Sequence, residues 1–171
     1  TVASQEGGEK KPIVFIFHAW CGKDAFVEEK AIEIARLGYV GCALDIYGKG
    51  VLKEGKEECS ALMNPFIEDR QMLKERILAY KSLFKSIPEA DPTKAAAIGY
   101  CFGGLAALDL ARSVEDLKGV VSFHGLLNPP GIPYENKMKA KVLVFHGQKD
   151  PMVSPEDIEG FMSEMDFLEV D

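Results

Sequence analysis

The sequence contains no long basic run, no C-x-x-C pair and no hydrophobic stretch as long as a membrane span. A net charge of −7 without a basic patch argues against nucleic acid or an anionic membrane as a partner. A transmembrane helix needs about 20 apolar residues in a row. Without a C-x-x-C pair, zinc and thioredoxin-type sites have no support. These absences leave a globular protein that acts on small molecules or binds them.

Only four cysteines occur: Cys21, Cys42, Cys59 and Cys101. A chain of 171 residues can bury a sizeable core without disulfides. Residues 1–11 also lack the apolar core of a signal peptide. Together these features predict reduced thiols and a cytoplasmic protein. Cys42 lies in an apolar run and is expected in the core, Cys59 has no predicted role, and Cys21 either fills space or forms a redox pair with Cys101.

Continuous apolar runs alternate with amphipathic segments along the chain. Such runs are typical of parallel strands that are buried on both faces. The predicted strands are Ile13–Phe17, Tyr39–Leu44, Ala95–Ile98, Val120–Phe123 and Val142–Phe145. The predicted helices are Asp24–Leu37, Ile67–Phe84, Phe102–Arg112 and Pro155–Met165. This order predicts one α/β domain over residues 1–171, with a doubly wound, mostly parallel sheet and a site at the carboxyl ends of the strands. Residues 48–66 are expected to be irregular, and residues 125–137 to form a rigid loop over the same edge.

The most specific motif is Gly99-Tyr-Cys101-Phe-Gly103-Gly104, between a predicted strand and a predicted helix. This is the setting of a nucleophile elbow, with cysteine where G-x-S-x-G enzymes carry serine. Glycines on both sides of Cys101 remove the Cβ atoms that would clash in so tight a turn. The helix N-terminus is expected to lower the pKa of the thiol. A small buried cysteine in the core is the alternative interpretation of Cys101.

A second motif, His146-Gly-Gln-Lys-Asp150-Pro151, follows the run Val142–Phe145. Asp150 is either the acid of a catalytic triad or a turn residue before proline. With the cysteine elbow, this motif resembles the dienelactone hydrolase family of the α/β-hydrolases, over about Ile13 to Asp166. The resemblance implies a cysteine-dependent hydrolase of small esters or lactones, similar to carboxymethylenebutenolidase, with Cys101 as nucleophile, Asp150 as acid, and neither metal nor organic cofactor.

The resemblance also places two oxyanion donors, the backbone N–H groups of Trp20 and Phe102. The family often has glutamate just before the first donor, where this chain has Ala19. That difference argues against a mechanism in which a carboxylate gates the thiol.

Four further side chains are candidates for the pocket. His18 follows the first predicted strand, and a structural role is favoured over a catalytic one. Tyr47 could line the pocket, next to Asp45, which is expected to tie down its loop. Arg70 could bind a substrate carboxylate, although a structural ion pair or a solvated helix face is favoured. His124 ends the fourth predicted strand, where a packing role is favoured over that of a base.

No histidine follows His146, although the family carries its catalytic histidine after the acid. The resemblance therefore implies an α/β-hydrolase domain that lacks the last strand and the histidine loop, either because it is truncated at both ends or because it is a natural short form. Such a fragment is expected to be inactive, and its open sheet edge could form a homodimer. The alternative is a non-catalytic binding protein with this fold.

Overall fold

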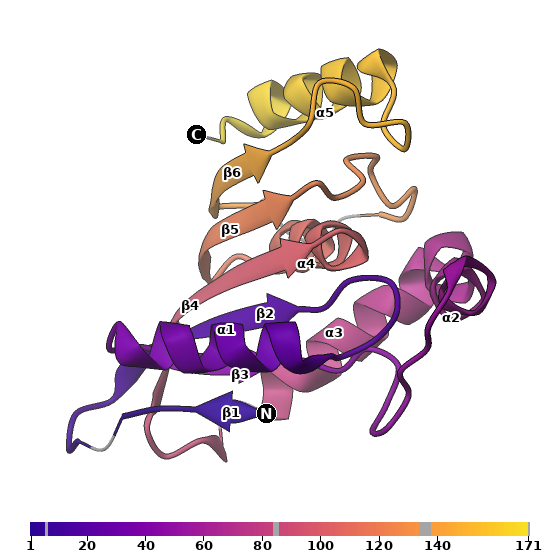
Figure 1. Ribbon diagram of the computed structural model, residues 1–171. Helices are drawn as coiled ribbons and strands as arrows, with labels where there is room; N and C mark the ends of the chain where they lie inside the picture. The colour runs from indigo at the N-terminus through magenta and orange to yellow at the C-terminus, as the bar shows by residue number, and fades with distance from the viewer. Residues whose placement is uncertain (6, 84–85, 134–137, 171) are drawn as a thin grey trace.

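A six-stranded sheet forms the centre of the protein (Figure 1). The computed structural model describes residues 1–5, 7–83, 86–133 and 138–170. The strands are β1 (Val2–Ala3), β2 (Lys11–Phe17), β3 (Val40–Ala43), β4 (Ala90–Tyr100), β5 (Leu117–Phe123) and β6 (Lys141–Phe145). Their order is β1-β3-β2-β4-β5-β6, and all neighbours are parallel except β1 and β3. The predicted α/β class and mostly parallel sheet are confirmed.

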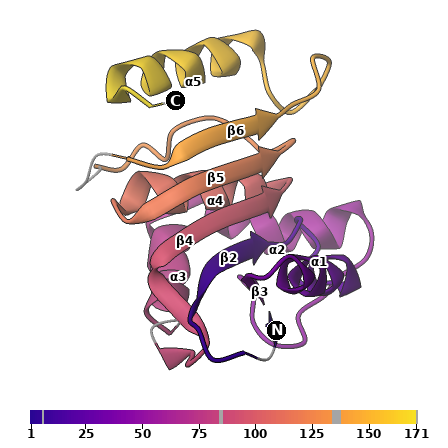
Figure 2. The ribbon, with the colours of Figure 1, turned by 90° about the vertical axis from the view of Figure 1, so that its left-hand side faces the viewer.

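Helices cover the sheet on both faces, as Figures 1 and 2 show. The helices are α1 (Ala25–Arg36), α2 (Lys56–Glu68), α3 (Arg70–Leu83), α4 (Phe102–Ser113) and α5 (Pro155–Leu168). A smaller core with Val27 and Ala31 lies under α1, and a larger core with Leu73, Leu108 and Phe161 lies under α3, α4 and α5. Within the described residues, no helix is both long and apolar enough to cross a membrane.

Two elements differ from the sequence prediction. The segment 48–66, expected to be irregular, contains most of α2, which buries Cys59, Met63 and Phe66. The spacing of these three residues is helical, but Pro65 lies inside the helix and weakens that signal. The short strand β1 was not predicted, because two residues give no periodicity. The predicted helix end at Phe84, and residues 134–137 of the predicted rigid loop, lie outside the described residues.

Strand β6 is open on one face, contrary to the prediction that each strand is buried on both. Leu143 and Phe145 are each 50% exposed, whereas Val142 and Val144 pack against the larger core. The cause is the position of α1, which packs over β1, β2 and β3 at the other side of the sheet. In the described part of the chain, β6 is also an edge strand. Pairing of two copies at this edge stays a prediction.

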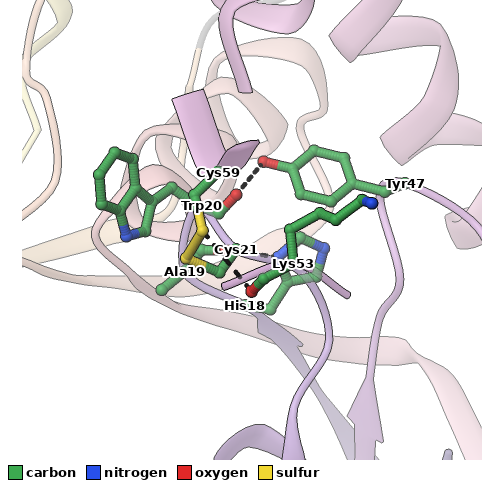
Figure 3. Close-up of a disulfide and its surroundings, with 7 residues drawn as sticks. All are labelled: His18, Ala19, Trp20, Cys21, Tyr47, Lys53 and Cys59. Carbon is green, nitrogen blue, oxygen red and sulfur yellow. Dashed lines mark hydrogen bonds between the residues drawn. A yellow bond between two sulfur atoms is a disulfide. The ribbon is translucent and has the colours of Figure 1, made fainter. Parts of the chain in front are cut away.

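The prediction of four reduced thiols is wrong, because Cys21 and Cys59 form a disulfide (Figure 3). Cys42 and Cys101 are free, and Cys42 is buried in the core as expected. The bond joins the loop after β2 to α2, so Cys21 is not a redox partner of Cys101. The same loop is held by the backbone bond from Lys53 N–H to the Cys21 carbonyl, 3.0 Å long.

We expect reduction of this disulfide to destabilise the protein. Its two cysteines are 38 residues apart, and opening a loop of that size typically lowers the free energy of unfolding by about 2–4 kcal/mol. Urea unfolding with and without dithiothreitol measures the change. The double variant Cys21→Ala/Cys59→Ala is the control, and its midpoint should not respond to dithiothreitol. Equal midpoints for the oxidised and reduced wild-type protein would contradict the prediction.

Candidate active site

Cys101 occupies a strained turn between β4 and α4. Its φ of 56° and ψ of −119° lie in a region that non-glycine residues rarely adopt. The turn is held by hydrogen bonds from Cys101 N–H to the Phe123 carbonyl, 2.9 Å, and from Gly104 N–H to the Cys101 carbonyl, 2.9 Å. This is the geometry of a nucleophile elbow.

The flanking glycines are required by close backbone contacts. A Cβ atom on Gly99 would lie 1.8 Å from the Gly103 carbonyl oxygen, and one on Gly103 would lie 2.4 Å from the Phe17 carbonyl oxygen. These contacts bring the start of α4 against the ends of β2 and β4. The predicted reason, a clash inside the turn, is therefore confirmed for Gly99, whereas Gly103 is required by the close approach of β2.

A pocket of about 180 Å³ opens beside the elbow. Its lining joins residues that follow four different strands: Trp20 after β2, Cys101 after β4, His124 after β5 and Asp150 after β6. All four lie at the carboxyl ends of parallel strands, where ligands bind in open α/β sheets. The rest of the lining is apolar apart from the peptide groups and consists of Met63, Phe102, Leu126 and Met152.

The thiol of Cys101 is less acidic than the sequence predicted. Burial raises its pKa, and the nearby charge of Asp150 acts in the same direction. Hydrogen bonds from the backbone N–H groups of Phe102 and Trp20 lower the pKa, but by less. The expected effect of the helix N-terminus is thus present in the Phe102 N–H, and desolvation outweighs it.

Asp150 and His124 reach the pocket without a hydrogen bond to each other among the described residues. One Asp150 carboxylate oxygen accepts from Met152 N–H at 2.9 Å, which closes the turn before α5. His124 is exposed and has a φ of 43°. The backbone N–H of His124 donates to the Phe145 carbonyl at 2.8 Å, so β6 holds the backbone of His124.

Three of the four further pocket candidates lie behind the pocket wall. His18 is fully buried, and its ring lies 6.4 Å from that of Phe102. Tyr47 stacks on Phe102 with ring centroids 5.8 Å apart. The expectation that His18 and Tyr47 border the cleft is therefore corrected, because neither lines it. The His18 ring instead accepts a hydrogen bond from Ile46 N–H in the loop after β3. Asp45 accepts from Gly48 N–H at 2.9 Å and ties down its loop, as predicted.

Arg70 is part of a buried ion-pair network and not of the pocket lining. Its guanidinium makes two 2.7 Å bonds to the carboxylate of Asp109 on α4. Arg112 contacts Asp109 at 3.2 Å and Glu164 on α5 at 2.6 Å. The favoured interpretation of Arg70 as a structural ion pair is confirmed. The sequence analysis missed Asp109 and Arg112, although charges facing the core side of an apolar helix are a usable signal.

The same network fixes the loop that carries Leu126. Arg112 donates to the Leu127 carbonyl at 3.0 Å, and Arg70 donates to the Asn128 carbonyl at 3.3 Å.

In the described ranges, no three His, Cys, Asp or Glu side chains gather as metal ligands do. The pocket therefore offers a thiol, two backbone donors, a carboxylate and an imidazole in an apolar setting.

The fold and sequence are similar to those of several solved structures and curated proteins. The solved structure of m3DLH is 35% identical with a TM-score of 0.92, covering 99% of this chain and 71% of that chain. The dienelactone hydrolase-like promiscuous phosphotriesterase P91, from metagenomic libraries, is 32% identical with a TM-score of 0.90, covering 96% of this chain and 69% of that one. An uncharacterised Caenorhabditis elegans protein is 41% identical over 95 residues, which is 54% of this chain and 60% of that protein.

The chain matches less than two thirds of the length of each of these curated relatives. The matches span 59% to 66% of their lengths. The family model described as "Dienelactone hydrolase family" matches residues 1–171, the whole of the sequence. With the α/β-hydrolase fold and the cysteine elbow, this match shows that the chain belongs to the dienelactone hydrolase family.

Proposed function

We propose that the protein is a cysteine-dependent hydrolase of small carboxylic esters or lactones. The observation that carries the proposal is the shared pocket of Cys101 and Asp150 beside two backbone N–H donors that point to the sulfur. A nucleophile, an oxyanion site and a carboxylate around one cavity are the components of acyl transfer. The apolar remainder and the volume of about 180 Å³ suit a small, mostly uncharged substrate.

The reaction begins with attack of the Cys101 thiolate on the carbonyl carbon. A C–S bond forms, and the carbonyl π electrons move to the oxygen, which accepts hydrogen bonds from Trp20 and Phe102 N–H. Collapse of this oxyanion breaks the C–O bond, and the leaving alkoxide takes up the proton that the base received from the thiol. Water then attacks the thioester, gives its proton to the base and releases the acid and the thiol.

The base in this scheme is a histidine oriented by Asp150. His124 is the candidate within the chain, and a histidine from residues after Asp171 in a longer protein is the other. The competing function, a non-catalytic binding protein, is favoured by the raised pKa of the Cys101 thiol. It is disfavoured by the strained φ and ψ of Cys101, which a binding pocket does not require.

Acylation of Cys101 tests the proposed function. Incubation with p-nitrophenyl acetate should transfer one acetyl group to Cys101, because attack on the ester needs only the thiolate and the oxyanion donors. Peptide mapping by mass spectrometry locates the acetyl group. Trapping the thioester at once, with acid, prevents its hydrolysis.

Two variants control the acylation experiment. Cys101→Ala should abolish thioester formation, whereas Cys42→Ala should not change it, because burial raises the pKa of Cys42 to about 12 and keeps it protonated. Acetylation confined to lysine, or equal in wild-type protein and Cys101→Ala, would remove the case for a cysteine hydrolase.

A cytoplasmic location is a further proposal, but the Cys21–Cys59 disulfide counts against it and removes the support that reduced thiols would have given. The cytoplasm keeps most protein thiols reduced. Lysis of the source cells in N-ethylmaleimide, followed by mass spectrometry, reports the state of Cys21 and Cys59 in the cell. Alkylated cysteines would support a cytoplasmic protein, and an intact disulfide would contradict it.

A further inference from the structure

The imidazole of His18 lies directly behind one of the two N–H donors at Cys101. The ring is 0% exposed, and its Nε2 accepts a hydrogen bond from Ile46 N–H at 3.0 Å. A backbone N–H can only donate, so Nε2 carries no proton. Burial lowers the pKa of His18, which keeps the ring neutral and places its single proton on Nδ1.

That Nδ1–H donates to the carbonyl oxygen of Ala19, 2.6 Å away. The Ala19 carbonyl belongs to the same peptide unit as the Trp20 N–H. A trans peptide is planar, and its C=O and N–H point in opposite directions. A hydrogen bond that fixes the carbonyl at one end therefore fixes the direction of the N–H at the other, which donates to the Cys101 sulfur.

Among the described residues, the shortest hydrogen bond to the Ala19 carbonyl comes from the imidazole of His18. The Gly22 N–H also donates to the Ala19 oxygen, but at 3.3 Å. Tyr47 holds the next peptide, since its hydroxyl donates to the Trp20 carbonyl at 2.8 Å (Figure 3). The Tyr47 ring also packs on His18, with centroids 4.8 Å apart.

We propose that His18 is a positioning residue whose Nδ1–H aims the Trp20 N–H at the Cys101 sulfur and, during acyl transfer, at the oxyanion. His18 touches neither the sulfur nor the pocket and acts through the Ala19–Trp20 peptide. The oxyanion role rests on the proposed function, whereas the hydrogen bond to Cys101 does not. Without the hydrogen bond from His18, the Ala19–Trp20 peptide can rotate, and the Cys101 sulfur then keeps only the Phe102 N–H as a donor.

Two substitutions separate the two ends of the ring. His18→Gln can keep an acceptor near the Nε2 position for Ile46 N–H, but it has no donor at the Nδ1 position. His18→Asn can keep a donor at the Nδ1 position for the Ala19 carbonyl, but it is too short to reach Ile46. A merely structural role for His18 predicts no difference between these variants at Cys101.

The readout is the rate of Cys101 alkylation by iodoacetamide as a function of pH, followed by peptide mapping of the 171-residue protein. Losing one N–H donor raises the pKa of the thiol, so less thiolate is present at a given pH. His18→Gln should react about threefold to tenfold more slowly than wild type at pH 8, with rates that converge at high pH. His18→Asn should follow the wild-type profile, because it keeps the donor.

The other groups that act on this thiol are the same in every variant. Asp150 raises the pKa of Cys101, the Phe102 N–H lowers it, and Tyr47 stays protonated because burial raises the pKa of its phenol. Cys42 serves as an internal reference for folding in every variant: burial raises its pKa to about 12, so it should stay unalkylated in folded protein. A His18→Gln profile that superimposes on wild type, or an equal shift in His18→Asn, would overturn the proposal.

A measurement on the wild-type protein covers the case in which a variant does not fold. Nitrogen-15 NMR of the histidine rings should show His18 as the neutral Nδ1–H tautomer at neutral pH. An Nε2–H tautomer or an imidazolium would overturn the proposal. If the His18→Gln profile shifts while esters fail to acylate Cys101, the proposed function falls and the positioning role stands.

Discussion

Replacing Asp109 with alanine is expected to lower the free energy of unfolding by about 3–5 kcal/mol. Asp109 is 2% exposed and contacts two buried guanidinium groups, those of Arg70 and Arg112. Its removal leaves Arg70 without the carboxylate that makes two hydrogen bonds to it. A buried charge that loses its partner keeps its full desolvation cost, which is why the effect exceeds that of a surface pair. Urea unfolding followed by circular dichroism measures it.

Two further variants of the protein test whether the loss at Asp109 is specific to the buried network. Asp116→Ala removes an ion pair with Lys81 in which Asp116 is 50% exposed, and it should cost less than about 1 kcal/mol. The double variant Arg70→Met/Asp109→Leu replaces the buried pair with apolar side chains and should recover part of the loss. If Asp109→Ala is no more destabilised than Asp116→Ala, the network does not support the packing of α3 on α4.

The elbow could be predicted from the sequence because its cause is local. Gly99 is needed because a Cβ atom there would meet the Gly103 carbonyl, two residues after Cys101, so this part of the motif carries its own steric reason. Gly103 is needed for a different reason, the approach of the Phe17 carbonyl of β2, which is distant in sequence. The carboxyl ends of parallel strands share one sheet edge, which is why Asp150 could be placed beside Cys101 from the run before it. The tie between Asp45 and Gly48 is local as well.

Contacts between distant segments could not be predicted in the same way. Cys21 and Cys59 are 38 residues apart, and Arg70 and Asp109 are 39 apart, so only the folded chain brings each pair together. The acidity of Cys101 is a balance of burial against two N–H donors. The family resemblance placed the donors, but neither it nor the sequence indicated the burial. The open face of β6 depends on where α1 lies, and the apolar run of β6 carries no information about the position of α1.

The identity of the base can be tested on the chain itself and on a longer form. We expect the 171-residue protein to turn over aryl esters slowly, because among the described residues no hydrogen bond joins the His124 side chain to Cys101 or Asp150. Absence of a triad member typically lowers the turnover rate by about 10⁴-fold. A form extended beyond Asp171 that supplies a histidine to the pocket should regain this factor. Steady-state release of p-nitrophenol measures both rates.

Substitutions in the extended form then separate the two histidines. Cys101→Ala, or replacement of the added histidine, should return the rate to that of the 171-residue protein or below it. His124→Ala should change the rate less than about tenfold if His124 only lines the pocket. The opposite result would make His124 the base: the 171-residue protein would turn over at the extended rate, and His124→Ala would abolish that activity. In that case β6, which holds the His124 backbone at the Phe145 carbonyl, would position a catalytic residue.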